Sequence, residues 1–357
     1  MANPRSAALH GALARVAPGT PLRDGLDRIV RAKMGALVVI GDGPDVLSIC
    51  SGGFLLDAPF SPQRLSELAK MDGAIIITTD GTRIARANVH LVPNPNTPTS
   101  ETGTRHRTAE RVARSIDVPV VSVSEDMSVI AVYIGETKHV LEDIPRLLNR
   151  ANQALQTLER YKLRLDDVSG TLSALEVQDL VTVRDVATVL QRSEMARRIS
   201  AEIDNQVVEL GADARLIQLQ LNELMGDAED ERWSVLQDYC GCPTEQDIDD
   251  ALVVLSDLDD EDLLDLHVVS RVLHLGEGEE GVDRSVAPRG YRLLAKLHRL
   301  PEDVIESVVA RFGSLHRIMR ATVADLDDVA GVDTEGARSI KDGLTRLAET
   351  SILDRYS

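Results

Sequence analysis

Three short polar segments in the first third of the chain carry residue types that can bind a nucleotide and a metal ion. Asp72-Gly73-Ala74 leads into the apolar run AIIITT, TGTRHRT at 102–108 opens a helical pattern, and SVSED at 122–126 closes another apolar run. A carboxylate at the mouth of a strand can hold a divalent cation, and a glycine beside it lets a ligand approach the backbone. Asp72 is therefore a candidate cation ligand. The alternatives are an ordinary turn at Asp72-Gly73 and a capped turn between strands at SVSED.

The segment TGTRHRT is the strongest of the three. Hydroxyls, a glycine, two arginines and a histidine gather at the start of a helix predicted over 105–116. Free backbone N–H groups and the helix dipole favour an anion at such a start. Arg105 and Arg107 add bidentate donors for phosphate oxygens, and without an anion these cations would oppose the dipole. The pattern therefore favours phosphate binding over a solvent-facing first turn, whereas His106 alone could equally be a packed surface histidine.

The elements that must position these segments alternate between strand and helix patterns, which indicates an α/β domain over residues 1–140 with a mixed sheet covered by helices. An Asp80-Gly81 turn signal joins two of the strands. Strands are predicted at 35–41, 46–50, 74–79, 83–92, 118–124 and 129–134, and helices at 2–16, from Thr20-Pro21 onward, at 61–70 and at 105–116.

From Ile144 onward the pattern becomes helical. No proline occurs between Pro145 and Pro243, and apolar residues recur at gaps of three and four from Ile203 to Leu224, which predicts one stripe of a long helix. Residues 141–282 hold 32 acidic and only 12 basic side chains. We therefore expect an acidic, all-α spine over 141–282, its charges solvated, followed by a hinge at 276–288.

In this order the segments resemble the diadenylate cyclase domain family over roughly residues 10–140, through GALVVIG, SGGF, LAKMDGAIII, TGTRHRTAERVA and VSVSED. The resemblance implies an enzyme that joins two ATP molecules into cyclic di-AMP. Asp72 and Glu125 would hold Mg²⁺ or Mn²⁺, and Arg105 and Arg107 would act with Asp72 in catalysis. The implied ATP contacts are Gly73, Ala74, Thr104, Arg105, His106, Arg107, Thr108 and Ser124.

The last part of the chain, residues 283–357, resembles tandem helix-hairpin-helix units, and the whole layout is similar to bacterial checkpoint diadenylate cyclases. Such hairpins point backbone N–H groups at DNA phosphates. Asp333 departs from the pattern, because it stands where the second hairpin usually has a glycine. Its carboxylate would repel a DNA phosphate at that point, so more of the DNA contact is expected from residues 289–299. A small helical bundle used for oligomer contacts is the alternative. The predicted DNA contacts are Arg289, Arg292, Gly331, Arg338 and Lys341.

The charge distribution is compatible with nucleic acid and nucleotide partners at both ends of the chain. The formal net charge is −19, but residues 1–140 carry 15 basic and 14 acidic side chains, and residues 283–357 carry 12 of each. Neither end is repelled from phosphates by its own net charge. A DNA-binding scaffold whose nucleotide domain only senses ATP is the alternative to the enzyme, although a sensor has no need of a metal carboxylate aimed at the sugar.

Three further expectations concern surroundings and assembly. No apolar run approaches the roughly 20 residues that cross a bilayer, and the three cysteines form neither a disulfide framework nor a zinc pattern. We therefore expect a cytoplasmic, nucleoid-associated protein without membrane contact. One ATP site per domain and two new bonds per product imply that two domains face each other, and the resemblance implies a homo-oligomer, an octamer of paired cyclase domains.

Overall fold

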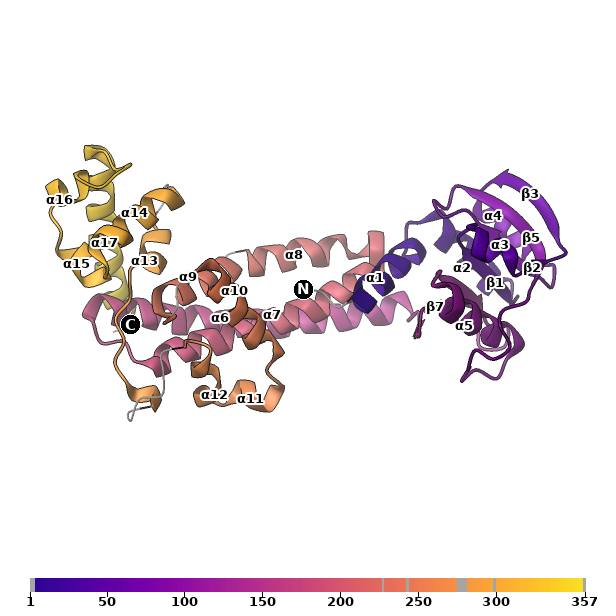
Figure 1. The fold of residues 1–357 in the computed structure, drawn as a ribbon, viewed down its shortest axis with the longest axis horizontal. Coiled ribbons are helices and arrows are strands. Elements are labelled where there is room, and N and C mark those ends of the chain that lie inside the picture. The colour runs from indigo at the N-terminus through magenta and orange to yellow at the C-terminus, as the bar shows by residue number, and fades with distance from the viewer. Residues whose placement is uncertain (1–3, 227, 242–243, 275–280, 298–299, 356–357) are drawn as a thin grey trace. The chain divides into compact units, whose positions relative to one another are not determined.

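The protein is described by a computed structural model that covers residues 4–226, 228–241, 244–274, 281–297 and 300–355 (Figure 1). Two compact units divide the chain. The first comprises residues 1–153 and 202–219, and the second comprises 154–201 and 220–357. No helix within the described ranges is long and apolar enough to cross a membrane.

The first unit is built on a mixed eight-stranded sheet within its described residues. The order along the sheet is β2-β5-β4-β1-β6-β7-β8, and β3 pairs with β5. Among the strands that the structure describes, only β1 and β4 pair in parallel, so the predicted mixed sheet is confirmed. The strands are β1 (Ala36–Ile40), β2 (Cys50–Ser51), β3 (Phe54–Pro59), β4 (Ala74–Ile77), β5 (Arg83–Leu91), β6 (Val120–Val123), β7 (Ile130–Ile134) and β8 (Thr137–Val140).

Helices cover both faces of this sheet, which explains why its central strands are continuous apolar runs instead of alternating ones. On one face α1 (Pro4–Val16), α2 (Pro21–Arg31) and α4 (Pro62–Leu68) pack against alternate residues of β1, β4 and β6. On the other face α3 (Pro44–Ser48) and α5 (Thr104–Ile116) pack against the intervening residues. Proline in the first turn of α2, α3 and α4 fits the start of a helix, where no N–H partner is needed.

The prediction of a strand at 46–50 is wrong. Gly43 and Pro44 begin the short helix α3 here, because Pro44 fixes a helical φ at the first position. Only Cys50 and Ser51 remain as β2. Two strands also lacked a prediction, since β3 is largely exposed and β8 alternates between exposed and half-buried residues, so neither forms an apolar run.

The long helical stripe after Ile203 does not form a single helix. Helix α7 (Val183–Leu210) ends before the 3-10 turn η1 (Gly211–Ala214), and α8 (Arg215–Met225) follows. Gly211 has a φ of +52°, which no α-helix contains, and a side chain there would lie 2.6 Å from the Pro18 carbonyl oxygen. The apolar residues keep their spacing, and Ile203, Leu210 and Ile217 are buried. The helix is interrupted where the chain packs against Pro18, whose carbonyl accepts the N–H of Ala212 at 3.0 Å.

The second unit is all-α, apart from one isolated bridge within its described residues. It contains most of the long helix α6 (Ile144–Gln178) and the first part of α7. Its remaining elements are α9 (Ala228–Tyr239), α10 (Glu245–Asp257), α11 (Asp260–Leu264), α12 (Leu266–Arg271), η2 (Gly281–Asp283), α13 (Tyr291–Ala295), α14 (Glu302–Phe312), α15 (Leu315–Arg320), α16 (Val323–Asp327) and α17 (Thr334–Arg355).

The expected hinge at 276–288 lies partly outside the described residues, which resume at Gly281. The described part is anchored to the loop between α6 and α7. Val183 donates its N–H to the Arg284 carbonyl at 3.0 Å, and Val286 donates to the Val181 carbonyl at 2.9 Å. This short ladder holds residues 284–286 in place within the second unit.

Candidate functional site

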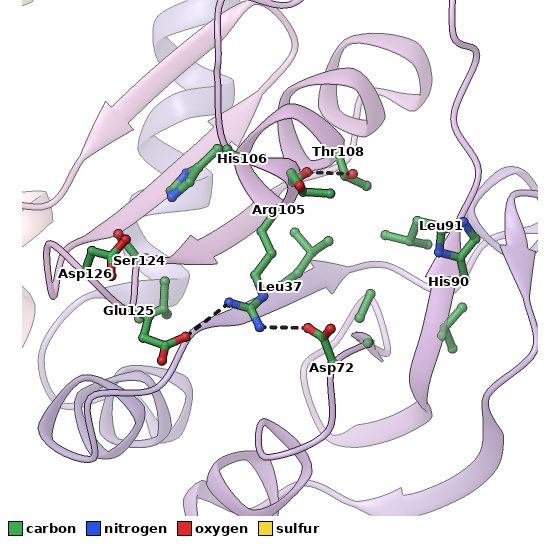
Figure 2. Close-up of a pocket in the computed structure, with 16 residues that line it drawn as sticks. Leu37, Asp72, His90, Leu91, Arg105, His106, Thr108, Ser124, Glu125 and Asp126 are labelled. Atoms are coloured by element: carbon green, nitrogen blue, oxygen red, sulfur yellow. Dashed lines mark hydrogen bonds and ion pairs between the residues drawn. The ribbon is translucent and has the colours of Figure 1, made fainter.

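The three polar segments meet at one cavity of about 620 Å³ in the first unit (Figure 2). Since β1 and β4 are parallel and β6 is antiparallel to β1, the starts of β1 and β4 and the end of β6 share one edge of the sheet. Asp72 and Gly73 come from the start of β4, Gly103 and Thr104 from the start of α5, and the residues after Val123 from the end of β6. The structure therefore brings together the segments that the sequence singled out.

Arg105 occupies the centre of this cavity, between two carboxylates. Its Nη2 donates to Asp72 Oδ1 at 2.8 Å, and its Nη1 lies 3.8 Å from Glu125 Oε2 (Figure 2). The side chains of Asp72 and Glu125 are 94 % and 62 % exposed, so both can accept further partners. A bound polyphosphate would compete for Arg105 and release both carboxylates toward a cation.

The donor set fits Mg²⁺ or Mn²⁺. Asp72 and Glu125 offer oxygen ligands, which these cations prefer. Within the part of the chain that the structure describes, no cluster of three or more His, Cys, Asp or Glu side chains could hold a metal ion. Two protein carboxylates, completed by substrate phosphates and water, are a common arrangement for Mg²⁺. Asp72 and Glu125 are thus suited to a cation that arrives with a nucleotide.

Two glycines shape the site through the space that a side chain would fill. A Cβ at Gly73 would lie 2.5–2.7 Å from atoms of Asn88, so β4 and β5 can pair here only because residue 73 has no side chain. A Cβ at Gly35 would lie 2.1 Å from Arg105 Nη1. The sequence predicts that Gly73 makes room for a ligand. In the structure, the space that a side chain at residue 73 would need is occupied by Asn88 of β5.

Gly35→Ala is expected to lower catalytic efficiency by about tenfold, because the new methyl group displaces the Arg105 guanidinium from its place beside Asp72, and small misplacements of a reacting site are costly. Gly35 has no positive φ, so the backbone itself tolerates alanine. Steady-state kinetics with ATP would measure the effect. Gly43→Ala is the matched control, since nothing lies within 4 Å of its added Cβ; equal kinetics for both variants would contradict the steric role of Gly35.

His106 is packed against its neighbours, as the alternative interpretation allowed, and it also lines the cavity. Its Nδ1 lies 3.0 Å from the hydroxyl oxygen of Tyr133, and the ring is half-buried while lining the cavity. Burial lowers its pKa, Glu101 opposes this shift, and Lys138 and Arg105 add to it. The side chain is thus held in one orientation at the cavity wall.

The other predicted contacts occupy three different settings. Arg107 is exposed on α5 and does not line the cavity. Thr108 lines it, but its hydroxyl donates to the Thr104 carbonyl at 2.9 Å. Ser124 Oγ accepts the N–H of Met127 at 3.3 Å, which is the capped turn left open as an alternative, although Ser124 also lines the cavity.

Several cavity residues were not among the predicted contacts. Leu37 from β1 and Val89, His90 and Leu91 from β5 complete the lining. Their residue types are ordinary for strands; the pairing of β5 with β4 brings Val89, His90 and Leu91 to the cavity, whereas Leu37 comes with β1, which pairs with β4. Leu37 lies in the GALVVIG segment that carries the resemblance, whereas the sequence holds no signal for Val89, His90 and Leu91 beyond the strand itself.

The structure changes the set of candidate DNA contacts in the second unit. Arg292 is 1 % exposed, and its guanidinium donates to Glu176 at 2.8 and 3.0 Å and to Glu231 at 3.0 Å. A side chain so buried and so fully bonded does not contact DNA, so that prediction is wrong for Arg292. The local pattern Tyr-Arg-Leu-Leu does not indicate this burial, because the partners of Arg292 lie 61 and 116 positions away along the chain.

Two further candidates have their cationic groups engaged by backbone carbonyls. Arg289 donates to the carbonyls of Gln237 and Cys240 at the end of α9, at 2.7 and 2.8 Å. Lys341 Nζ donates to the carbonyls of Met319 and Ala321 at 2.6 and 2.8 Å. Both side chains cap helix ends. Of the stretch 289–299, residues 298 and 299 lie outside the described ranges.

Gly331 and Arg338 remain exposed at the second predicted hairpin. Gly331 has a φ of +83°, which favours glycine in the turn between α16 and α17. Asp333 Oδ1 accepts the Gly336 N–H at 2.7 Å, so its carboxylate already occupies the start of α17. Exposed Arg317 and Arg320 on α15 follow the first turn at Gly313, and the sequence interpretation did not single them out.

Comparisons with known proteins agree with this geometry. The family described as DisA bacterial checkpoint controller nucleotide-binding matches residues 23–138, and the family described as DisA bacterial checkpoint controller linker region matches residues 141–282. The DNA integrity scanning protein DisA of Acidothermus cellulolyticus is 55 % identical over 351 residues, covering 98 % of this chain and 95 % of that protein. The protein of the same name from Streptomyces coelicolor is 52 % identical over 351 residues, covering 98 % and 94 %. The chain belongs to the DNA integrity scanning protein DisA family and is a diadenylate cyclase.

Proposed function

We propose that the N-terminal domain joins two ATP molecules into cyclic di-AMP, releases two pyrophosphates, and depends on Mg²⁺ or Mn²⁺ held by Asp72 and Glu125. The observation that supports this proposal most directly is the position of Arg105, at the start of α5, between these two carboxylates. A site that holds an arginine and two acidic groups in one cavity suits a ligand that brings both a polyanion and a cation.

The start of α5 would hold the triphosphate. Gly103 caps this helix without a side-chain hydrogen bond, so the N–H groups of its first turn are available to an anion. Arg105 would leave Asp72 for a phosphate oxygen and stabilise charge on the departing pyrophosphate. Exposed Arg107 would contact the outer phosphates as the nucleotide fills the cavity mouth.

The metal ion, when bound, screens the α-phosphate and lowers the cost of forming the attacking 3′-oxygen. Asp72 would help to hold this ion near the ribose of one ATP, and Gly73 and Ala74, which line the cavity, would contact the nucleotide. No protein nucleophile is required, because the 3′-hydroxyl of one ATP attacks the α-phosphate of the other. Thr104, Thr108 and Ser124 would contribute hydroxyl contacts from the cavity wall.

Two N-terminal domains would face each other to complete the reaction. Each chain supplies one cluster of Asp72 and Arg105, whereas the cyclic product contains two new bonds between two nucleotides. A facing pair places each 3′-hydroxyl against the other nucleotide's α-phosphate. We therefore propose a homo-oligomer of paired domains, an octamer, in keeping with the family resemblance.

Incubation of the full chain with ATP and Mn²⁺, followed by mass analysis for cyclic di-AMP, tests this function. Chelation of the metal should abolish the product. Mixing wild-type chains with an excess of Asp72→Asn chains should lower the cyclic product per wild-type chain, because a mixed pair completes one bond only. A constant yield per wild-type chain, with subunit exchange verified, would show that a single chain completes both bonds.

We further propose that residues 283–357 bind DNA and that this binding regulates the cyclase, which places the protein at the nucleoid. Two exposed turns support this proposal, one at Gly313 and one at Gly331. Exposed arginines that could contact phosphates lie near them, namely Arg317, Arg320 and Arg338. Contacts of this type release counterions, so affinity should fall steeply with salt. The titration of labelled duplex and branched DNA at several salt concentrations measures both affinity and salt slope.

Asp333→Gly is expected to tighten DNA binding by about fivefold at low salt, the scale of one unit charge removed from near a phosphate. Asp333 fills the α17 N-terminus with its own carboxylate, and glycine restores a free anion site with little loss of capping. Asp333→Asn is the matched control that keeps a capping oxygen without the charge. If neither variant changes DNA affinity, the second hairpin does not contact DNA.

A further inference from the structure

A chain of hydrogen bonds runs behind the cavity from His106 to β8. The Tyr133 hydroxyl, on a side chain only 1 % exposed in β7, lies 3.0 Å from His106 Nδ1 and donates to Glu101 Oε1 at 3.2 Å. Lys138 Nζ donates to the same Glu101 oxygen at 2.5 Å and lies 5.9 Å from the centre of the Tyr133 ring. His106 lies on α5, Glu101 on the segment before α5, Tyr133 on β7 and Lys138 on β8.

The hydrogen bonds of the Tyr133 hydroxyl determine which nitrogen of His106 carries a hydrogen in both charge states of the ring. A phenol has one hydrogen, and Tyr133 gives it to the Glu101 carboxylate. Burial and the neighbouring Glu101 raise the pKa of Tyr133, so it stays a phenol. Its oxygen must therefore accept a hydrogen from His106 Nδ1. Nδ1–H persists in both charge states of the ring, so protons are gained and lost only at Nε2.

His106 lines the cavity, and a Cβ added at Gly103 would lie 3.4 Å from Cδ2 of its ring, the carbon bonded to Nε2. Since Nδ1 is turned toward buried Tyr133, it is this Cδ2–Nε2 side of the ring that lies at the start of α5. The charged or titratable groups around the ring are Arg105, Glu101, Tyr133 and Lys138. Burial, Lys138 and Arg105 lower the pKa of His106 against the effect of Glu101. A triphosphate would favour the cationic form, because an opposite charge nearby stabilises it.

We propose that His106 is the general acid for the departing pyrophosphate, delivering a proton from Nε2, and that Tyr133 and Glu101 are positioning residues that hold its Nδ1–H. This inference rests on the proposed placement of the triphosphate at the start of α5. The 3′-oxygen of one ATP bonds to the α-phosphorus of the other, and the α-phosphorus–oxygen bond to the β-phosphate breaks. The hydroxyl proton passes to water, the Nε2 proton passes to the leaving oxygen, and solvent reprotonates His106.

The first test varies the basicity of the leaving group. His106→Gln should lower kcat with ATP by about 10²-fold, the lower range for general acid catalysis. Its defect should shrink with β,γ-difluoromethylene-ATP and grow with β,γ-methylene-ATP, whose leaving group is more basic and needs the proton more. An equal loss with all three substrates would overturn the acid role and leave His106 as a binding residue only.

The second test addresses the positioning residues. Tyr133→Phe removes the acceptor for Nδ1–H, so kcat should fall about tenfold with little change in KM, and the pH dependence of kcat should shift. Glu101→Gln should shift the same profile. Tyr161→Phe is the matched control, since Tyr161 lies on α6 and is not among the residues that line the cavity. Thermal unfolding verifies folding; a folded Tyr133→Phe protein with the wild-type profile would contradict the assignment.

The third test measures the proton itself. Titration of wild-type protein with 3′-deoxy-ATP, which cannot react, in buffers of different ionisation enthalpy should show proton uptake on binding near pH 7. His106→Gln should bind without that uptake. Binding with no uptake by the wild type overturns the proposal, while cyclic di-AMP formation by the same preparation would leave the proposed function intact.

Discussion

Replacing Asp72 with asparagine is expected to lower cyclic di-AMP synthesis by about 10²-fold or more while ATP binding is largely retained. Asparagine preserves the shape of the side chain but removes the negative charge that would hold the cation. Arg105 also loses its ion pair at 2.8 Å and becomes freer to bind phosphate in the ground state. The loss should therefore appear in kcat and not in KM.

Steady-state synthesis and equilibrium binding of 3′-deoxy-ATP separate the two effects. Asp45→Asn is a matched control, because Asp45 is an exposed carboxylate on α3 that does not line the cavity. It should retain the parent rate. Near-parental synthesis by the Asp72→Asn protein would mean that Asp72 is not a catalytic ligand.

The second large effect is expected at Arg292, where Arg292→Met should destabilise the second unit by about 3–5 kcal/mol. Glu176 is 3 % exposed and receives two hydrogen bonds from the Arg292 guanidinium. Methionine fills much of the same volume but leaves this buried carboxylate without its cation. The penalty comes from the unpaired charge, since a buried pair contributes little compared with well-packed apolar residues.

Urea unfolding of the full chain, followed by circular dichroism, measures this change. The double variant Glu176→Gln with Arg292→Met removes both charges and should recover most of the lost stability. If the single and double variants unfold at the same denaturant concentration, the ion pair does not carry the effect. Arg338→Met, at an exposed arginine on α17, should leave stability within about 0.5 kcal/mol of the parent.

Hydrogen bonds between α9 and α13 make point substitutions a better test of DNA binding than truncation. Asp238 accepts the N–H groups of Gly290, Tyr291 and Arg292 at 2.6–2.9 Å, so α13 is joined directly to α9. Removal of residues 283–357 would expose Asp238 and Glu176 and damage the helices that remain. Point substitutions at exposed Arg317, Arg320 and Arg338 therefore test DNA binding more cleanly than truncation.

The amino-acid sequence determined the local structure around the site, because local structure depends on neighbours along the chain. The apolar run after Asp72 can only be a buried strand, and Gly103 followed by polar residues and an apolar periodicity starts α5 within one residue of the predicted position. The same locality explains the error at α3. Gly43-Pro44 begins a helix, and this signal outweighs the apolar residues that favoured a strand.

What only the tertiary structure decided is which distant residues meet. Asp72 and Arg105 are 33 positions apart, and they pair because α5 packs on the face of the sheet in which β4 lies beside β1, an order set by contacts along the whole sheet. Arg292 shows the same limit more sharply, since its partner Glu176 lies 116 positions away. Its residue type predicted a surface cation, and packing placed it in the interior. The burial of a side chain depends on the surfaces that close over it, and no local pattern encodes those surfaces.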